Sequence, residues 1–322
     1  MDRVPFVFME RVVSLLPVNP HQIHKLFAPI EGLWATAAAE LEANYHYVKV
    51  FIIPQENSMS VSKVWPSRRE AELFEEPDRY TLDLSLNVFD CDDRNPKAEP
   101  RPFSEERLKQ ILRLPSKGGF YSNFVVMRPP RREDNAFDFG GLLRNLQVPF
   151  ASVNMCDCRG YPEEIEEFLR NLIPKRTCGL FVFTNVDLTP TSVDLLLDVW
   201  DTWTPYDQNL KTGYPTMALR IVACSQTLAK AHISRVLNGW LEGRGARMLE
   251  TSPSEFSDIG TFCRTFEIQE PQWKVQLREG CTYHILIHSS SGITIMVRYL
   301  PTERRPQRLV LTVFNQNKAS NV

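Results

Sequence analysis

In the central part of the chain, short apolar runs alternate with amphipathic stretches. Residues 150–157 and 180–184 have the apolar and β-branched character of strands. Residues 162–173 place apolar side chains at helical spacing, and residues 189–200 open with a threonine N-cap followed by proline. The two predicted strands start about 30 residues apart, a spacing typical of a repeated strand-helix unit.

The same rhythm extends to both sides of these two units. Further strands are predicted at residues 45–54, 79–89, 124–127, 217–224 and 265–268, and further helices at residues 104–113, 138–146 and 228–241. In residues 79–89, leucines alternate with polar residues, which predicts a strand with one buried and one exposed face. Helices on one side of parallel strands would give a leucine-rich-repeat-like solenoid, and helices on both sides a doubly wound sheet. The repeat period and the helix length favour an irregular solenoid over residues 45–270.

Beyond residue 270 the pattern changes to strands without helices. Residues 273–277, 283–288, 293–299 and 309–314 predict antiparallel strands, with a hairpin turn at residues 289–292. Residues 271–322 are therefore expected to form a β-rich C-terminal cap. The expected fold class is α/β.

Residues 1–44 are predicted to be helical without strands. Apolar side chains fall on one face of the first helical stretch, residues 5–16, and further stretches follow at residues 21–27 and 33–41. A bundle this small buries little apolar surface by itself. We expect it to dock on another surface.

This N-terminal segment resembles an F-box, the short module that docks on the Skp-type adaptor of a cullin-RING ubiquitin ligase. The matching positions are Pro5, Phe8, Val12, Leu16, Ile23, Leu26 and Trp34. The opening phrase is similar to that of nematode-type F-box and F-box-associated proteins, whose C-terminal regions are thought to bind substrates. The resemblance implies an F-box-like module at residues 1–44 that contacts a Skp-type adaptor and, through it, a cullin. The alternative is an ordinary helical cap at the end of the repeats.

Composition excludes several classes of protein. Hydrophobic residues make up 43% and charged residues 24% of the 322 residues, which is typical of a globular chain. A net charge of -2 gives no overall attraction to nucleic acid or to an anionic membrane, and no secretion signal or membrane span is visible. Seven scattered cysteines fit reduced thiols. We therefore expect an intracellular protein, cytoplasmic or nuclear, with no nucleic-acid or membrane partner.

No pattern in the chain indicates catalysis, a metal or a cofactor. Cys156 and Cys158 would share one face of a strand, but the further ligands that zinc requires are missing. His284 and His288 lie near serines without the motif of a hydrolase, and no phosphate-binding glycine loop is present. We interpret these cysteines as packing residues and expect no enzyme activity.

Two basic clusters, residues 128–133 and 304–308, are predicted to be solvated loops, with contacts to phosphate or an acidic peptide as the alternative.

These expectations combine into one functional prediction, a substrate-recognition adaptor of an SCF-type ubiquitin ligase. It would bind a Skp-type adaptor through its N-terminal helices and a protein substrate through outward strand residues. The candidate substrate-face residues are Asp83, Ser85, Asn154 and Asp157. The alternatives are a protein-interaction scaffold without a ubiquitin connection and an enzyme with an unrecognised cleft.

Overall fold

The chain is α/β, with seven α-helices and thirteen strands of a mixed sheet among the described residues. The computed structural model describes residues 29, 32–65, 81–89, 101–113, 122–130, 137–175, 178–202, 218–245, 248–252, 258–277, 283–302 and 305–315. The chain divides into two compact units. Unit 1 comprises Met1–Val153 and Pro174–Cys178, and unit 2 comprises Asn154–Ile173 and Gly179–Val322.

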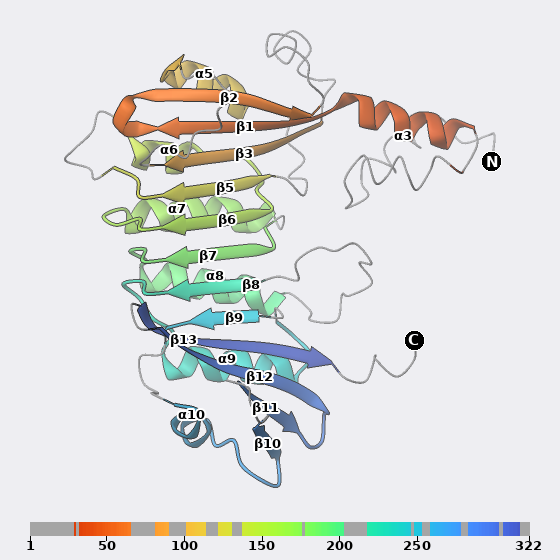
Figure 1. The fold of residues 1–322 in the computed structure, drawn as a ribbon, viewed down its shortest axis with the longest axis vertical. Helices are drawn as coiled ribbons and strands as arrows, with labels where there is room; N and C mark the ends of the chain where they lie inside the picture. Colours follow the sequence, from red (N-terminus) through yellow and green to blue (C-terminus); the bar gives the residue numbers. More distant parts are fainter. Residues whose placement is uncertain are drawn as a thin grey trace. The chain divides into compact units, whose positions relative to one another are not determined.

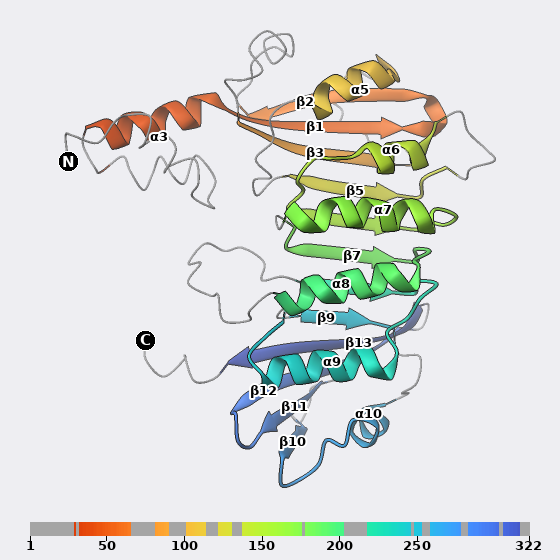
Figure 2. The same cartoon turned by 180° about the vertical axis from the view of Figure 1, so that it is seen from behind.

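Unit 1 contains the first five strands, in the order β4-β2-β1-β3-β5. Its elements are α3 (Leu33–Asn44), β1 (Tyr45–Ile53), η1 (Pro54–Glu56), β2 (Ser58–Trp65), β3 (Thr81–Phe89), β4 (Arg101–Pro102), α5 (Glu105–Leu112), β5 (Asn123–Met127) and α6 (Phe139–Asn145). β2 pairs with β1 and β4 in antiparallel fashion, whereas β3 is parallel to both β1 and β5. Within this unit, α5 and α6 lie on one side of the strands (Figure 2).

The core of unit 1 follows from the alternation of apolar residues in its strands. Val48, Val50 and Ile52 of β1 are at most 1% exposed, and they lie opposite Leu84, Leu86 and Val88 of β3. Ser104 caps α5 as expected, because its hydroxyl accepts a hydrogen bond from the Arg107 N–H at 3.2 Å.

The expectation of one exposed face on β3 is wrong at Ser85 and Asn87, which are only 4% and 7% exposed. The larger side chains of β1 lie opposite them, with Lys49 facing Ser85 and Phe51 facing Asn87. The Asn87 amide also donates to the Ser85 hydroxyl at 3.1 Å and to the Val50 carbonyl at 3.2 Å. Small polar side chains that form a hydrogen bond with each other can therefore be buried between larger neighbours.

Unit 2 contains the remaining elements, and its strand order is β6-β7-β8-β9-β13-β12-β11-β10. Its elements are β6 (Ser152–Cys156, which begins in unit 1), α7 (Pro162–Leu172), η3 (Ile173–Lys175, which ends in unit 1), β7 (Leu180–Thr184), α8 (Pro190–Thr202), β8 (Ala218–Val222), α9 (Lys230–Leu241), β9 (Met248–Thr251), α10 (Ile259–Thr265), β10 (Trp273–Leu277), β11 (Tyr283–His288), β12 (Ile293–Thr302) and β13 (Arg305–Asn315). β7, β8 and β9 are parallel, and β13 joins β9 in antiparallel fashion.

Within unit 2, helices α7, α8 and α9 lie on the same face of the strands (Figures 1 and 2). Two fully buried tryptophans pack where α8 meets α9, because the rings of Trp200 and Trp240 lie 5.7 Å apart between centroids. The predicted cap of α8 is confirmed, since the Thr189 hydroxyl accepts from the Ser192 N–H at 3.0 Å. The strand-helix units of the sequence are thus present.

Two sequence predictions for unit 2 differ from the structure. Residues 265–268 form the end of α10 and a turn instead of a strand, and β9 provides the last parallel strand. The physical reason is the Asp258 side chain, which accepts from the Thr261 N–H at 2.9 Å and so starts a helix there. No solenoid is detected in the described part of the chain.

The four C-terminal strands confirm the antiparallel arrangement expected beyond residue 270. β10 pairs with β11, β11 with β12, and β12 with β13, all antiparallel. Residues 305–308 lie in β13, so this part of the expected basic loop is wrong.

Candidate protein-binding surface

One face of the sheet in unit 2 has no helix on it among the described residues (Figure 1). The other face is covered by the helices, and Leu219 and Ile221 of β8 are buried there. The alternate residues, Ala218 and Arg220, are half-exposed on the helix-free side. We call this helix-free side of β6 to β13 the open face.

The strand register aligns the residues of the open face in two rows. The first row is apolar apart from Thr312, and it runs through Leu180, Ala218, Met248, Thr312, Met296 and Ile285. All six side chains are half-exposed. The open face therefore presents an apolar stripe to the solvent.

The second row, which we call the charged row, contains three charged residues and lies two positions away from the first on every strand. It runs through Val182, Arg220, Glu250, Val310, Arg298 and Tyr283. Two residues of a strand span about 6.6 Å, so the charged and apolar rows lie next to each other.

Glu250 is the centre of the charged row and is only 2% exposed. Its Oε2 accepts from the Nε of Arg220, directly opposite on β8, at 2.6 Å. Its Oε1 lies 3.3 Å from Nη1 of Arg308 on β13. One buried carboxylate thus pairs with two guanidinium groups, a pairing that offsets the cost of removing its charge from water.

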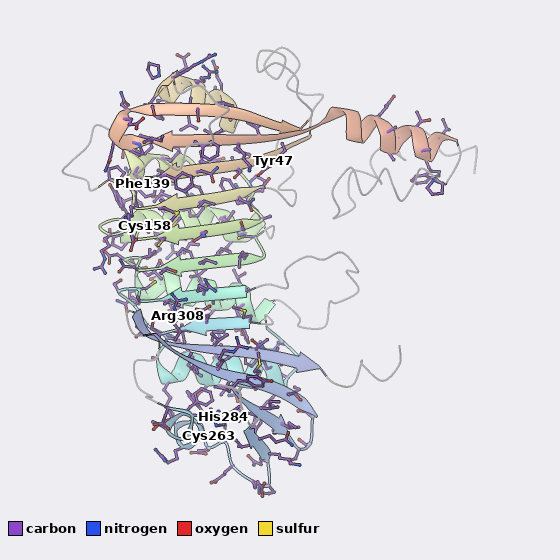
Figure 3. All side chains as sticks on the ribbon, in the orientation of Figure 1. Tyr47, Phe139, Cys158, Cys263, His284 and Arg308 are labelled. Atoms are coloured by element: carbon purple, nitrogen blue, oxygen red, sulfur yellow. The ribbon has the colours of Figure 1, made fainter. Side chains whose placement is uncertain are left out.

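Arg298 of β12 is the third arginine on the open face, and it has no acidic partner in the described structure. Its guanidinium carbon lies 5.9 Å from the centre of the Tyr283 ring. The Nε atoms of Arg298 and of Arg308 are buried without any hydrogen-bond acceptor. Figure 3 labels Arg308 on its strand. The three guanidinium groups therefore have more donors than the one carboxylate satisfies.

The turns that follow the parallel strands of unit 2 share one backbone conformation. The residue after β6 is Asp157, after β7 Asn185 and after β8 Ala223, and all three have φ between 55° and 57°. The Asp157 N–H donates to the Thr184 carbonyl, and the Asn185 N–H to the Val222 carbonyl. Each of these two turns is thus hydrogen-bonded to the end of the neighbouring strand.

The predicted substrate-face residues are not gathered at one place. Asn154 of β6 is half-exposed, and its buried neighbours in the strand, Val153 and Met155, point to the other face. Asp157 lies in the turn beyond β6, where its Oδ1 accepts from the Asn185 amide at 2.5 Å. Ser85 is buried in unit 1, so its placement on an outward face is wrong.

Asp83 is a residue of β3, and its side chain lies outside the description. The binding role of these four residues stays a prediction.

Most of the predicted adaptor-binding residues lie outside the described residues. These are Pro5, Phe8, Val12, Leu16, Ile23 and Leu26. Trp34 lies in the first turn of α3 and is half-buried. In the same helix Ala37 and Ala38 are fully buried, which shows that α3 packs against other parts of the chain.

Cys158 and Cys224 of unit 2 are buried and have the surroundings of packing residues. Cys156 ends β6, and the left-handed turn at Asp157 places Cys158 in the core, so the two sulfurs do not share a strand face as expected. Burial raises the pKa of the Cys158 thiol well above 9.0. Burial likewise raises the pKa of Cys224 from 9.0 to about 11. Such thiols are weak nucleophiles at neutral pH.

The predicted turn at residues 289–292 places serines close to His288. Its Nδ1 lies 2.9 Å from the Ser291 hydroxyl, and its ring packs edge-on against Trp273 at 4.7 Å between centroids. His284 is in the same strand, and burial lowers its pKa below 6.5. The contacts of His288 stay within the hairpin and the neighbouring strand, as expected for a structural residue.

Comparisons with protein-family models, with curated proteins and with solved structures found no match. No helix in the described ranges is long and apolar enough to cross a membrane. Among the same residues, no group of three or more His, Cys, Asp or Glu side chains is placed to hold a metal ion.

The sequence prediction did not include the arginines of the charged row. The local signal for Arg220 was its position as the one charged residue of an otherwise apolar strand, residues 218–222. Their grouping depends on the strand order, because β13 inserts between β9 and β12 although it comes last in the sequence.

Proposed function

We propose that this chain is a non-enzymatic adaptor that holds a protein partner on the open face of unit 2. The apolar row, beside charged side chains and without a covering helix in the described structure, is the observation that supports this function. Its apolar side chains are half-exposed, and neighbouring apolar side chains that solvent can reach are a common mark of a protein interface.

The rigidity of the open face favours binding of a partner without rearrangement. Six of its strands are joined by continuous hydrogen-bonded pairing, from β7 and β8 through β9 and β13 to β12 and β11. A preformed surface loses little conformational entropy when a partner binds.

The experiment is affinity purification with the full chain from extract of its native source. Met248→Glu places a charge in the apolar row, whereas Asn238→Glu places the same charge on the exposed side of α9. We expect Met248→Glu to lose the partners that the wild-type chain and Asn238→Glu retain. Equal recovery with both variants would contradict the proposal.

A more specific form of the proposal is a substrate adaptor of an SCF-type ubiquitin ligase. Its support is the F-box-like sequence of residues 1–44, together with the position of Trp34 in the helix that contains the buried Ala37 and Ala38. In this form the N-terminal helices contact a Skp-type adaptor and the open face holds the substrate. The alternative form is a scaffold without a ubiquitin connection.

A binding experiment with a purified Skp-type adaptor distinguishes the two forms. In the ligase form, the full chain binds the adaptor, and Leu16→Asp or Trp34→Ala abolishes binding while Met248→Glu does not. Absence of binding by the wild-type chain would leave the scaffold form.

A further inference from the structure

The open face has an excess of positive charge that the whole chain does not have. Among the described residues of this face, the basic side chains are Arg220, Arg298, Arg308 and Lys274, and the acidic side chain is Glu250. The net charge of the complete chain is -2. Positive charge is thus concentrated on the face that we propose as the binding surface.

The single carboxylate does not satisfy the arginines around it. Each guanidinium group has five N–H donors, and Glu250 pairs with Nε of Arg220 and Nη1 of Arg308. Among the described residues, Arg298 pairs with no acid, and the Nε atoms of Arg298 and Arg308 have no acceptor. The Nε atoms are buried, so a ligand reaches these arginines only at the exposed parts of their side chains. The side chains of Arg220 and Arg308 are 37% and 17% exposed, and Arg298 is half-exposed. Further acceptors can bind the N–H donors there.

The surroundings of the arginines indicate what kind of molecule supplies those acceptors. The apolar row runs beside them over the same strands, from Met248 on β9 to Met296 on β12 and Ile285 on β11. Arg220 on β8 and Arg298 on β12 are three strand spacings apart, about 14 Å. A ligand that spans both rows needs several separated carboxylates and apolar groups, which a protein segment provides and a small anion does not.

We propose that the open face binds an acidic segment of its protein partner, with carboxylates on Arg220, Arg298 and Arg308 and apolar side chains on the neighbouring row. This inference rests on the proposed function and names the chemistry of the partner. Arginine is suited to this role because its planar fork pairs with both oxygens of a carboxylate. Glu250 positions the guanidinium groups of Arg220 and Arg308, and its negative charge repels an incoming carboxylate.

The test uses fluorescein-labelled ten-residue peptides of glutamate and leucine, titrated into the full chain at low and at moderate salt. A second peptide has glutamine in place of glutamate. We expect the glutamate peptide to bind at least ten times more tightly than the glutamine peptide, and its affinity to fall as salt rises.

Four variants of the chain test the named side chains. Arg298→Gln leaves the Glu250 ion pairs intact and is expected to weaken binding of the glutamate peptide about tenfold. Arg298→Lys retains the charge without the fork, and an intermediate loss is expected. Glu250→Gln removes the competing carboxylate and is expected to strengthen binding, a direction that a purely structural role of Glu250 would not produce. Lys230→Gln removes a positive charge on α9 and is expected to leave binding unchanged.

Circular dichroism confirms that each variant is folded before its affinity is compared. Equal binding of both peptides, or no binding of either, would overturn the inference. A competition with inorganic phosphate provides a further test. If phosphate displaces the peptide and chloride at the same ionic strength does not, the arginine cluster is a phosphate site and the inference is overturned. The purification experiment with Met248→Glu does not depend on peptide charge, so failure of this inference and failure of the proposed function are separable.

Discussion

Gly245 lies so close to the buried ring of Trp200 in unit 2 that a side chain would not fit at this position. A Cβ atom built on it would lie 2.1 Å from Cη2 and 2.3 Å from Cζ3 of Trp200. Its φ of +92° is also in the region that residues with side chains rarely adopt. The change Gly245→Ala therefore combines backbone strain with a steric clash.

The size of the expected effect follows from these two contributions. Left-handed strain in a residue other than glycine costs about 1–2 kcal/mol, and overpacking of a dense core costs about 1–3 kcal/mol. Trp200 is fully buried against Trp240, so its ring has little room to move. We expect Gly245→Ala to lower the free energy of unfolding by about 2–5 kcal/mol, measured by urea denaturation followed by tryptophan fluorescence.

Two other glycines separate the contributions. Gly160 has a φ of +82° with no atom within 4 Å of a built Cβ, so Gly160→Ala tests strain alone and should cost about 1 kcal/mol. Gly239 lies inside α9, and a Cβ built on it would lie 3.0 Å from Cζ3 of Trp200. In Gly239→Ala, the gain in helix propensity stabilises the chain and this tight contact destabilises it, so the two effects oppose each other. If Gly245→Ala destabilises the chain no more than Gly160→Ala, the reasoning about the close approach is refuted.

Three further predictions follow from local contacts. Ser104→Ala removes the cap of α5 and should lower the free energy of unfolding by about 1 kcal/mol in urea denaturation, with Ser104→Thr as the control that retains a hydroxyl. Cys158 and Cys224 should resist a thiol reagent in the native protein and react after unfolding, and rapid labelling of native Cys224 by mass spectrometry would contradict its burial. The Cys224 pKa is about 11 when folded against 9.0 ordinarily, so the unfolded chain loses this proton first. The free energy of unfolding should therefore fall as pH rises from 9.0 to about 11, by at most about 1.4 kcal/mol per pH unit for this group. Substitution of Cys224 by alanine should reduce this dependence on pH.

Local sequence patterns were sufficient for most of the secondary structure. The strand at residues 45–54 and the caps at Ser104 and Thr189 depend on neighbouring residues only, and these predictions are confirmed. The antiparallel strands at the C-terminus were predicted for the same reason. Residues 265–268 were assigned wrongly because the aspartate that caps α10 starts the helix seven residues earlier, at Asp258.

The candidate binding surface was less predictable because it depends on which strands become neighbours. Ser85 has the alternation of an outward residue, yet Lys49 of the adjacent strand lies opposite it and it is buried. Glu250 and Arg308 are 58 residues apart in the chain and meet because β13 pairs with β9. No local pattern specifies that pairing, so the contact of Glu250 with Arg308 was not foreseen.

The central claim is that a protein partner binds the open face of unit 2, and site-specific photo-crosslinking in cells of the native source tests it most directly. A photoreactive residue is placed at Val182, Met248 or Met296 on the open face, and at Asp194 or Asn238 on the exposed side of α8 and α9. The account predicts that the same partner is crosslinked from all three open-face positions and from neither helix position. Crosslinks from the helix positions alone, or none from the open face, would contradict it.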